Sequence, residues 1–325
     1  MGLDLRSPPA RTGGTKARHA SPTRGRWRAR LARLDIKFSP YLYISPFYLL
    51  FVLFGLFPLG YTFWVSLHHW EIIGDHEFAG FTNYTRLLTD DQFWNSVYNT
   101  FGMFVVATVP QLLLALMLAN ALNRRLRMPT LFRMGVLLPL VTSVAAVAIV
   151  FTQIFGRDYG MANWVLGMFG IENIDWQANK WSSWIAISVM VDWRWTGYNA
   201  LIFLAGMQAI PRDLYEAAAI DGASRRQQFW RITVPLLRPT IVFVTIISTI
   251  GGLQLFTEPL LFNSGHMEGG TLRQSQTVAM YMFENAFNRF QYGYGSAVAW
   301  MLFLLILIFS LINFLIIRRL AGGLK

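Results

Sequence analysis

From Pro211 to Pro239 the chain reads PRDLYEAAAIDGASRRQQFWRITVPLLRP, and this stretch predicts two short helices joined by a turn. Pro211 suits the first position of a helix, because its missing N–H would have no partner there. Asp213 and Glu216 then place negative charge near the positive end of the helix dipole. Gly222 is expected to end this helix, since glycine readily takes the conformation that follows a helix C-terminus. The first helix therefore lies between the proline and the glycine.

A second helix is predicted immediately after the glycine. Ser224 and Gln227 have the spacing of a capping box, in which each side chain binds the backbone N–H of the other residue. Phe229 and Ile232 mark its apolar side, and Pro235 falls near its end. Two short helices that present small residues and an aromatic side chain form a rigid unit able to sit in the groove of a partner protein.

Long apolar runs lie on both sides of this stretch. The chain has 325 residues, of which 54% are hydrophobic and only 14% charged, and this is too apolar for a soluble protein. A helix needs roughly 20 mostly apolar residues to cross a hydrocarbon core of about 30 Å. The sequence therefore predicts an all-α integral membrane protein with one transmembrane domain, residues 39–325, and six transmembrane helices. The expected spans are residues 41–67, 96–122, 134–156, 181–207, 236–262 and 292–317.

The distribution of Lys and Arg predicts the orientation, because basic residues in short segments beside the spans stay on the cytoplasmic side. Of the 28 Lys and Arg residues, 22 lie in residues 1–38, in the segments after the second and fourth spans, and at the C-terminal end. Both termini and the loop 208–238 are therefore predicted to be cytoplasmic. Residues 1–38, rich in Arg, Pro, Gly and Ser, are predicted to form a disordered basic tail that acts as an orientation signal. A role of this tail in binding anionic lipid or nucleic acid is an alternative.

The stretch at 211–239 resembles the EAA loop of permease subunits in binding-protein-dependent ABC importers. The family pattern is EAA, two residues, DGA, five residues, F, two residues, I, two residues, P, three residues, P. The preceding residues GMQAIPRDLYEAA, from Gly206 to Ala218, are similar to the version in maltose-type carbohydrate uptake permeases. The positions that match the pattern are Glu216, Ala217, Ala218, Asp221, Gly222, Ala223, Phe229, Ile232, Pro235 and Pro239.

The resemblance implies a maltose-permease-like fold in the bacterial plasma membrane, with the loop acting as a coupling helix that docks in a cleft of a cytoplasmic ATPase. The implied partners are a second permease subunit, cytoplasmic ATP-binding subunits, an extracytoplasmic solute-binding lipoprotein, a sugar and the lipid bilayer. ATP and Mg would be bound by the ATPase, so this chain is expected to bind no cofactor and to catalyse no reaction. The residues implied in ATPase coupling are Glu216, Ala217, Ala218, Asp221, Gly222, Ala223 and Phe229.

Polar side chains inside the spans indicate a candidate path for the solute. Charged groups there cost about 2.5 to 3.5 kcal/mol on insertion scales, so they are expected to face protein or a water-filled path. Aromatic faces beside amides and carboxylates suit a polyhydroxy solute such as a sugar. The similarity to maltose-type permeases assigns Trp193, Gly197 and Gln254 by motif, whereas Gly251 stands where a bulkier polar residue is expected. The predicted path residues are Trp193, Gly197, Tyr198, Asn199, Gln254 and Glu258.

Other interpretations remain for parts of this pattern. The EAA pattern also fits a permease for glycerol phosphate or an amino acid, but a phosphate calls for converging cations, and Arg194 is the one cation in the interior of a span. Asp192 and Arg194 could form structural ion pairs instead of contacting solute. A membrane-embedded enzyme using Asp192 and Glu258 as acid and base would turn over substrate as the purified chain alone. A DNA-binding helix-turn-helix is disfavoured, because both ends of the segment are tied to spans. A sugar-importer permease is the favoured interpretation.

Overall fold

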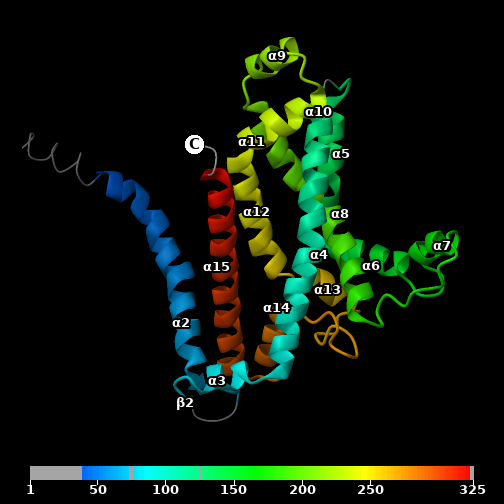
Figure 1. The fold of residues 1–325 in the computed structure, drawn as a ribbon. Coiled ribbons are helices and arrows are strands. Elements are labelled where there is room, and N and C mark those ends of the chain that lie inside the picture. Colours follow the sequence, from blue (N-terminus) through cyan, green and yellow to red (C-terminus); the bar gives the residue numbers. More distant parts are fainter. Residues whose placement is uncertain (1–38, 73–75, 125, 323–325) are drawn as a thin grey trace, which may run out of the picture. The chain divides into compact units, whose positions relative to one another are not determined.

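The computed structural model describes residues 39–72, 76–124 and 126–322, and these residues form helices with one small hairpin (Figure 1). The chain divides into a first unit that ends at Tyr61 and a second unit that begins at Thr62. The predicted disordered tail, residues 1–38, lies outside the described residues.

The described part of the first unit is helical. One helix runs from Ser39 to Ser66, and its last turns belong to the second unit. Within it, the π-helical turn η1 (Val52–Leu56) precedes α2 (Phe57–Ser66). Pro58 lies two residues after the π turn, and in an ordinary α-helix a proline ring clashes with the carbonyl group four residues earlier. A wider turn at this point accommodates the ring.

The second unit opens with a hairpin and a short helix. β1 (His68–His69) and β2 (Glu77–Phe78) pair antiparallel, with the first residue of β1 opposite the last residue of β2. Asn83 lies in α3 (Thr82–Leu88). Its Nδ2 donates to the carbonyl oxygens of Ser66 and His68, at 2.9 and 3.0 Å. These bonds fasten α3 to the segment that enters the hairpin.

α4 (Asp91–Leu122) and α8 (Lys180–Gln208) are two long helices that pack along one another in the second unit (Figure 1). Asp90 caps α4, because its side chain accepts hydrogen bonds from backbone N–H groups of the first turn. Gly102 in α4 leaves room for the indole ring of Trp184 in α8, and a Cβ at this glycine would lie 2.1 Å from the ring. The close approach of the two helices therefore depends on the absence of a side chain at Gly102.

The apolar run 134–156 folds as two helices and not as one. α5 (Pro129–Val141) and α6 (Val144–Ile154) meet at an angle of 88°. Thr142 between them is extended, and its hydroxyl donates back to a carbonyl oxygen of α5 at 2.9 Å. The chain then continues to the short helix α7 (Met161–Gly167).

Beyond α8 the chain forms a group of short helices at one end of the second unit, and then returns toward the other end (Figure 1). The return path bends by 68° where α12 begins, and the expected span 236–262 is interrupted at residues 254–256. The elements in this part are α9 (Asp213–Ile220), α10 (Arg225–Gln228), the π turn η2 (Phe229–Thr233), α11 (Val234–Leu236), α12 (Arg238–Leu253) and α13 (Thr257–Phe262).

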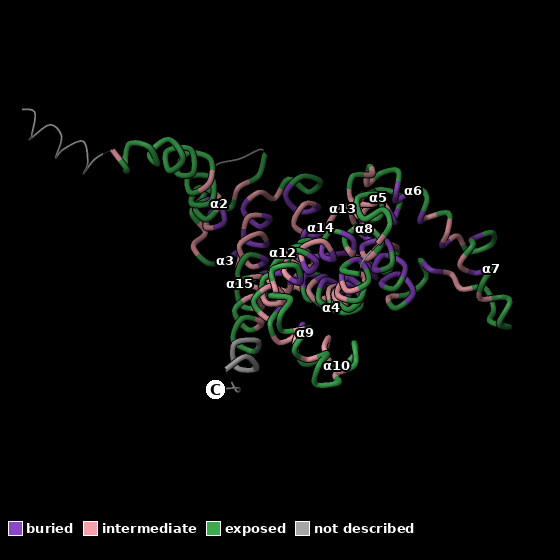
Figure 2. The backbone as a smooth tube through the Cα atoms, turned by 90° about the horizontal axis from the view of Figure 1, so that it is seen from above, coloured by how far each residue is buried: buried purple, intermediate pink, exposed green. Residues whose placement is uncertain are grey.

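The last elements are α14 (Val278–Phe283), the π turn η3 (Glu284–Asn288) and α15 (Tyr292–Gly322). Buried apolar residues of α4, α6, α8 and α13 form one cluster, and Figure 2 shows buried residues along these helices. A second cluster joins α3, α14 and α15, and a third joins the C-terminal halves of α4 and α8 to α12. The core of the second unit is therefore built around α4 and α8.

Three helices of the described residues are long and apolar enough to cross a membrane, and the number rises to five if each bent pair counts as one span. The three are Ser39–Ser66, α4 and the described part of α15, and the bent pairs are α5 with α6 and α10–α11 with α12. α8 is also long, at 29 residues, but its composition is less apolar. The prediction of a helical protein with several membrane-crossing helices is confirmed to this extent.

Candidate functional site

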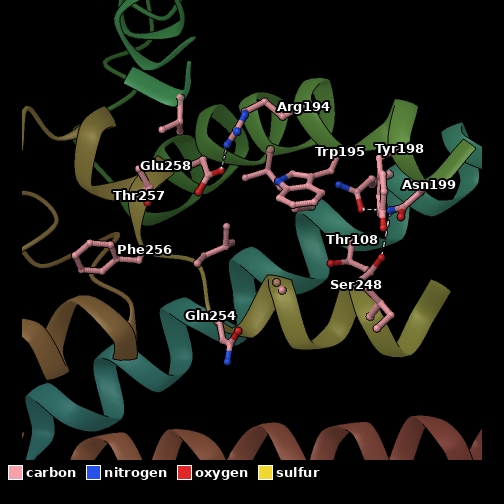
Figure 3. Close-up of a pocket in the computed structure, with 18 residues that line it drawn as sticks. Thr108, Arg194, Trp195, Tyr198, Asn199, Ser248, Gln254, Phe256, Thr257 and Glu258 are labelled. Atoms are coloured by element: carbon pink, nitrogen blue, oxygen red, sulfur yellow. Dashed lines mark hydrogen bonds and ion pairs between the residues drawn. The ribbon is translucent and has the colours of Figure 1, made fainter. Parts of the chain in front are cut away.

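A cavity of about 470 Å³ lies among α4, α8, α12 and α13 (Figure 3). It owes its position to the interruption after Leu253, where α12 ends and the chain stays non-helical until Thr257. Gly251 and Gly252, in the last turn of α12, also line the cavity, and a Cβ on Gly251 would meet no atom within 4 Å. The small residues and the break together leave room between the helices.

One side of α8 forms a wall of the cavity. Val191, Arg194, Trp195, Tyr198 and Asn199 all line it, and their spacing of three and four residues places them on the same side of a helix. The rings of Trp195 and Tyr198 meet edge to face, with centroids 6.1 Å apart (Figure 3). Both side chains are about one-third exposed, at 38% and 37%, so their rings are available to a solute.

Amide and hydroxyl groups form another part of the wall. The Nδ2 of buried Asn199 donates to Gln111 Oε1 at 3.1 Å and to Ser248 Oγ at 3.2 Å. These bonds connect α8 with α4 and with α12. Thr108 adds a hydroxyl one turn before Gln111 on α4. The cavity therefore combines ring faces with fixed hydrogen-bonding groups, as sites for small polar molecules commonly do.

An ion pair joins α8 to α13 at the cavity. Arg194 Nη1 lies 2.7 Å from Glu258 Oε1, and the two side chains are only 13% and 9% exposed (Figure 3). Removing one partner of such a buried pair typically costs 3 to 5 kcal/mol, because the other charge is left without compensation. Asp192, two residues before Arg194, does not line the cavity, and its Oδ1 is buried without a hydrogen-bond partner among the described residues.

The structure brings four of the six predicted path residues to this cavity: Tyr198, Asn199, Gln254 and Glu258. The other two lie on a different side of α8. Trp193 packs against Phe151 of α6, with ring centroids 5.7 Å apart. Gly197 packs against α5, where a Cβ would lie 1.8 Å from the carbonyl oxygen of Val136. Both residues therefore serve helix packing in this chain.

Several lining residues were not predicted from the sequence. Trp195 is not among the predicted path residues, and the sequence left Arg194 between a structural and a solute-binding role. Gln111 had a usable signal, because an amide inside an apolar run is costly unless it has a partner. Thr108 and Ser248 had no such signal, since hydroxyl residues occur on many helix faces in membranes.

The predicted coupling residues lie at the end of the second unit where α9 lies (Figure 1). None of them is buried, but Phe229 is half-buried and packs against the third apolar cluster. α9 begins at Asp213, two residues after Pro211, so the proline precedes this helix and does not open it as predicted. None of the α9 residues is buried. The hydroxyl groups of Tyr215 and Thr233 lie 2.9 Å apart and tie α9 to η2.

The turn between α9 and α10 has the predicted chemistry. Gly222 has a φ of +80°, and the N–H of Ala223 donates to the carbonyl oxygen of Ala218 at 2.8 Å. This pattern is a Schellman motif, which satisfies the last carbonyl groups of a helix. The capping box at Ser224 and Gln227 is present, with both reciprocal bonds. Asp221, Gly222 and Ala223 therefore hold α9 and α10 at a fixed angle to one another.

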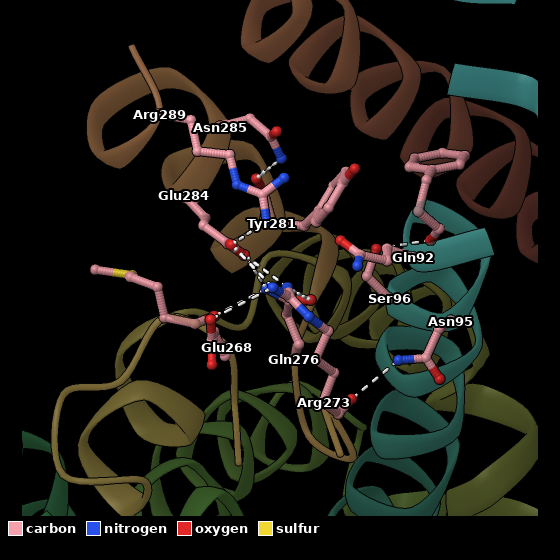
Figure 4. A network of polar contacts seen from close by, with 12 residues as sticks. Gln92, Asn95, Ser96, Glu268, Arg273, Gln276, Tyr281, Glu284, Asn285 and Arg289 are labelled. Carbon is pink, nitrogen blue, oxygen red and sulfur yellow. Dashed lines mark hydrogen bonds and ion pairs between the residues drawn. The ribbon is translucent and has the colours of Figure 1, made fainter. Parts of the chain in front are cut away.

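A polar network (Figure 4) lies next to α14, toward the end of the second unit opposite α9 (Figure 1). Buried Glu284 accepts hydrogen bonds from Arg273 at 2.8 and 3.0 Å, from Arg289 at 2.7 Å and from Gln276 at 2.6 Å. Burial alone would raise the pKa of Glu284, but these hydrogen bonds and the two positive charges outweigh it and lower the pKa. The network fixes the segment before α14.

No group of three or more His, Asp or Glu residues in the described parts of the chain is arranged to hold a metal ion. The cavity itself is lined by one basic and one acidic residue, Arg194 and Glu258, which already bind each other. Its remaining polar groups are amides and hydroxyls. The arrangement suits hydrogen bonding to an uncharged solute.

Comparisons with known proteins agree with this architecture. Residues 93–322 match the protein family described as "Binding-protein-dependent transport system inner membrane component". The arabinooligosaccharides transport system permease protein AraP of Halalkalibacterium halodurans is 34% identical over 277 residues, which cover 85% of this chain and 86% of the relative. The trehalose/maltose transport system permease protein MalF of Thermococcus litoralis is 34% identical over 273 residues, with 84% and 91% covered. The lactose transport system permease protein LacF of Rhizobium radiobacter is 36% identical over 284 residues, with 86% and 94% covered.

A solved structure shares the fold. A chain of a bacterial ABC transporter involved in the import of the acidic polysaccharide alginate superimposes with a TM-score of 0.73 at 21% identity, covering 89% of this chain and 99% of that chain. The family match extends from α4 to the end of α15, and so includes the cavity and the unit around α9. The chain belongs to the family of inner membrane components of binding-protein-dependent transport systems, a family of transport subunits and not of enzymes.

Proposed function

We propose that this chain is a permease subunit of an ATP-driven sugar importer, and that its solute is a disaccharide or a short oligosaccharide. The observation that carries the proposal is the cavity between α4, α8, α12 and α13, with its two aromatic rings and its fixed amides and hydroxyls. Ring faces stack on the apolar faces of sugars, and amides exchange hydrogen bonds with sugar hydroxyls. Relatives at 34–36% identity are named for arabinooligosaccharides, trehalose and maltose, and lactose.

The path for the sugar would run through this cavity. Tyr198 would offer a ring face, and Asn199, Gln254 and Glu258 would offer hydrogen-bonding groups. Trp193 and Gly197 would support the path indirectly, by holding α8 against α6 and α5. Residues 39–325 would form the transmembrane domain, with six spans once the bent pairs and α8 are counted as crossing the membrane.

The unit at residues 208–238 would couple this path to ATP hydrolysis on a partner chain. The small residues of α9, none of them buried, suit insertion into a cleft of a cytoplasmic ATPase. Closure of the ATPase subunits on ATP would move the unit, and the helices would rock between inward-open and outward-open states. The residues that would make the contact are Glu216, Ala217, Ala218, Asp221, Gly222, Ala223 and Phe229.

The remaining parts of the assembly follow from this arrangement. A second, similar permease subunit would complete the path, and an extracytoplasmic binding protein would deliver the sugar. The solved alginate transporter is described in complex with a periplasmic protein that carries an alginate pentasaccharide. The charge distribution favours a multi-pass protein of the bacterial inner membrane with both termini and the α9 end in the cytoplasm.

Uptake by the reconstituted assembly tests this function. Proteoliposomes that contain this chain, its partner permease and the ATPase, with the binding protein outside, are expected to accumulate at least one neutral oligosaccharide only when ATP is inside. Ala218→Cys is expected to cross-link to an ATPase subunit that carries a cysteine in its cleft. Thr89→Cys, in the exposed turn between α3 and α4 at the end of the second unit opposite α9, is the matched control and is expected to give no such product.

ATP-dependent accumulation of an amino acid or a glycerol phosphate in place of every sugar offered would overturn the sugar assignment. Absence of the cross-link in an assembly that still hydrolyses ATP would overturn the coupling role of the unit around Ala218.

A further inference from the structure

Arg194 and Glu258 are the two charged residues among those that line the cavity. They come from different helices, α8 and α13, and meet at 2.7 Å with little exposure to solvent. Because their charges cancel at contact distance, the cavity as a whole presents no net charge to a solute. The rest of the polar lining consists of neutral amides and hydroxyls, including those of Gln111, Asn199 and Ser248.

We propose that Glu258 masks Arg194 and thereby makes the cavity select neutral sugars over acidic ones. This inference rests on the proposed function and names the feature that sets its substrate class. The carboxylate of an acidic sugar would need a cation, and Arg194 is the one that the cavity offers. That cation is already bound by a carboxylate of the protein, so an acidic solute would have to compete with Glu258 for it.

Competition of this kind selects against the wrong solute. An acidic sugar that fails to displace Glu258 leaves its own charge in a largely buried space without a partner, and burying an unpaired charge is costly. Glu258 would also repel it. Specificity of this type comes from a penalty against the competitor as well as from attraction to the preferred ligand.

The guanidinium group of Arg194 retains the means to bind an anion. Its Nε is buried and has no hydrogen-bond partner among the described residues, so Glu258 does not use all of its donors. A guanidinium group can bind a carboxylate through two parallel hydrogen bonds. Loss of the negative charge at Glu258 would therefore expose a ready anion site at the edge of the cavity.

The test compares two pairs of sugars on the assembled complex of this chain, its partner permease and the ATPase in lipid nanodiscs. The probes are lactose against lactobionate and maltose against maltobionate, in which the second member of each pair carries a carboxylate. The binding protein is omitted, because its own selectivity would obscure that of the cavity. Equilibrium binding gives the ratio of acidic to neutral affinity for each variant.

Glu258→Gln is expected to raise this ratio on the order of tenfold, because one charge-assisted hydrogen bond is gained by the acid alone. Arg194→Gln with Glu258→Gln is the matched control: it also loses the ion pair but has no cation, so the ratio is expected to stay near that of the wild type. A ratio for assembled Glu258→Gln within twofold of the wild type overturns the inference. An equal rise in the double variant overturns it as well.

Glu258→Asp covers the case in which Glu258→Gln does not assemble. The carboxylate of aspartate is one methylene shorter, so the contact with Arg194 loosens, and a smaller rise of the same sign is expected. No rise in that variant overturns the inference. If the wild-type complex binds no sugar at all, the proposed function fails and the inference fails with it. If the wild-type complex binds a neutral sugar and the Glu258 variants leave the ratio of acidic to neutral affinity unchanged, only the inference fails.

Discussion

Two glycines in the second unit, Gly197 and Gly251, have opposite surroundings. A Cβ on Gly197 would lie 1.8 Å from the carbonyl oxygen of Val136, whereas a Cβ on Gly251 would meet nothing within 4 Å. Gly197 therefore permits the contact between α8 and α5. Gly251 instead leaves part of the cavity open, because it lines that space.

Alanine variants at the two positions distinguish a role in helix packing from a role in passage of the solute. Gly197→Ala is expected to destabilise the protein by about 1 to 3 kcal/mol, because the backbone of α5 has to move away. Gly251→Ala is expected to leave the thermal unfolding temperature unchanged and to lower the rate of sugar uptake, since its methyl group points into the cavity. The unfolding temperature in detergent and the uptake rate in proteoliposomes check the pair. A loss of stability in Gly251→Ala equal to that in Gly197→Ala would contradict the assignment.

For single residues, the sequence predicted which types of side chain line the cavity better than it predicted which side of a helix each one faces. Trp193 and Trp195 are two residues apart and so lie on nearly opposite sides of α8. The motif resemblance favoured Trp193, and the residue pattern gave no independent basis for choosing between them, because aromatic and polar residues occur throughout α8. Only the packing of neighbouring helices decides that Trp195 faces the cavity and that Trp193 meets Phe151.

Among the elements, the turn between α9 and α10 depends on a single residue, Gly222. Gly222 has a φ of +80°, and no atom lies within 4 Å of the position of a Cβ there. A side chain at this position would therefore be disfavoured by its backbone conformation and not by a collision. The left-handed conformation costs about 1 to 2 kcal/mol for most residues, and asparagine tolerates it better.

Gly222→Ala is therefore expected to loosen the angle between α9 and α10 and to lower the number of sugar molecules imported per ATP hydrolysed. Gly222→Asn is the matched control and is expected to lose less of this coupling. Sugar uptake and phosphate release, measured in parallel in proteoliposomes, give the number of sugar molecules imported per ATP hydrolysed. An equal number of sugar molecules imported per ATP in the wild type and the alanine variant would show that the geometry of the turn does not affect coupling.

The same elements show what local sequence can and cannot predict. The end of α9 and the start of α10 were predictable, because a glycine and a capping box act through their own backbone. The breaks inside residues 134–156 and 236–262 were not predicted. Proline and glycine occur within helices in membranes, where neighbouring helices compensate for the lost bonds, so Pro139 or Gly252 does not distinguish a continuous span from a broken one.

Across the second unit, α12 and α13, which line the cavity, lie between the α9 end and α14, next to which the polar network around Glu284 is built (Figure 1). The network reaches several elements. Arg273 binds Glu284 through its side chain, and its carbonyl oxygen accepts hydrogen bonds from Asn95 and Asn99 of α4, at 3.0 and 2.7 Å. The segment before α14 is thus held to a central helix on one side and to η3 on the other.

Ionisation of Glu284 maintains this network, and its effect on stability has a definite sign. The folded state lowers the pKa of Glu284 below its ordinary value of 4.5, because the bonds from Arg273 and Gln276 and the charges of Arg273 and Arg289 outweigh burial. A carboxyl group with a lowered pKa stabilises the folded state fully above its unfolded pKa. That contribution is lost as the pH falls through the lower, folded pKa.

Comparison with Glu284→Gln isolates this contribution, because glutamine cannot ionise and all other titrating groups are shared. At pH 7 the wild type is expected to unfold at a higher temperature than Glu284→Gln, since the variant leaves Arg273 and Arg289 without their carboxylate partner. The difference is expected to shrink as the pH falls below about 4.5, where protonation gives the wild type a neutral side chain as well. Thermal unfolding in nanodiscs between pH 7 and pH 3 measures it. A difference that stays constant over that range would mean that Glu284 acts through its shape and hydrogen bonds, and that its charge does not hold the segment before α14 in place.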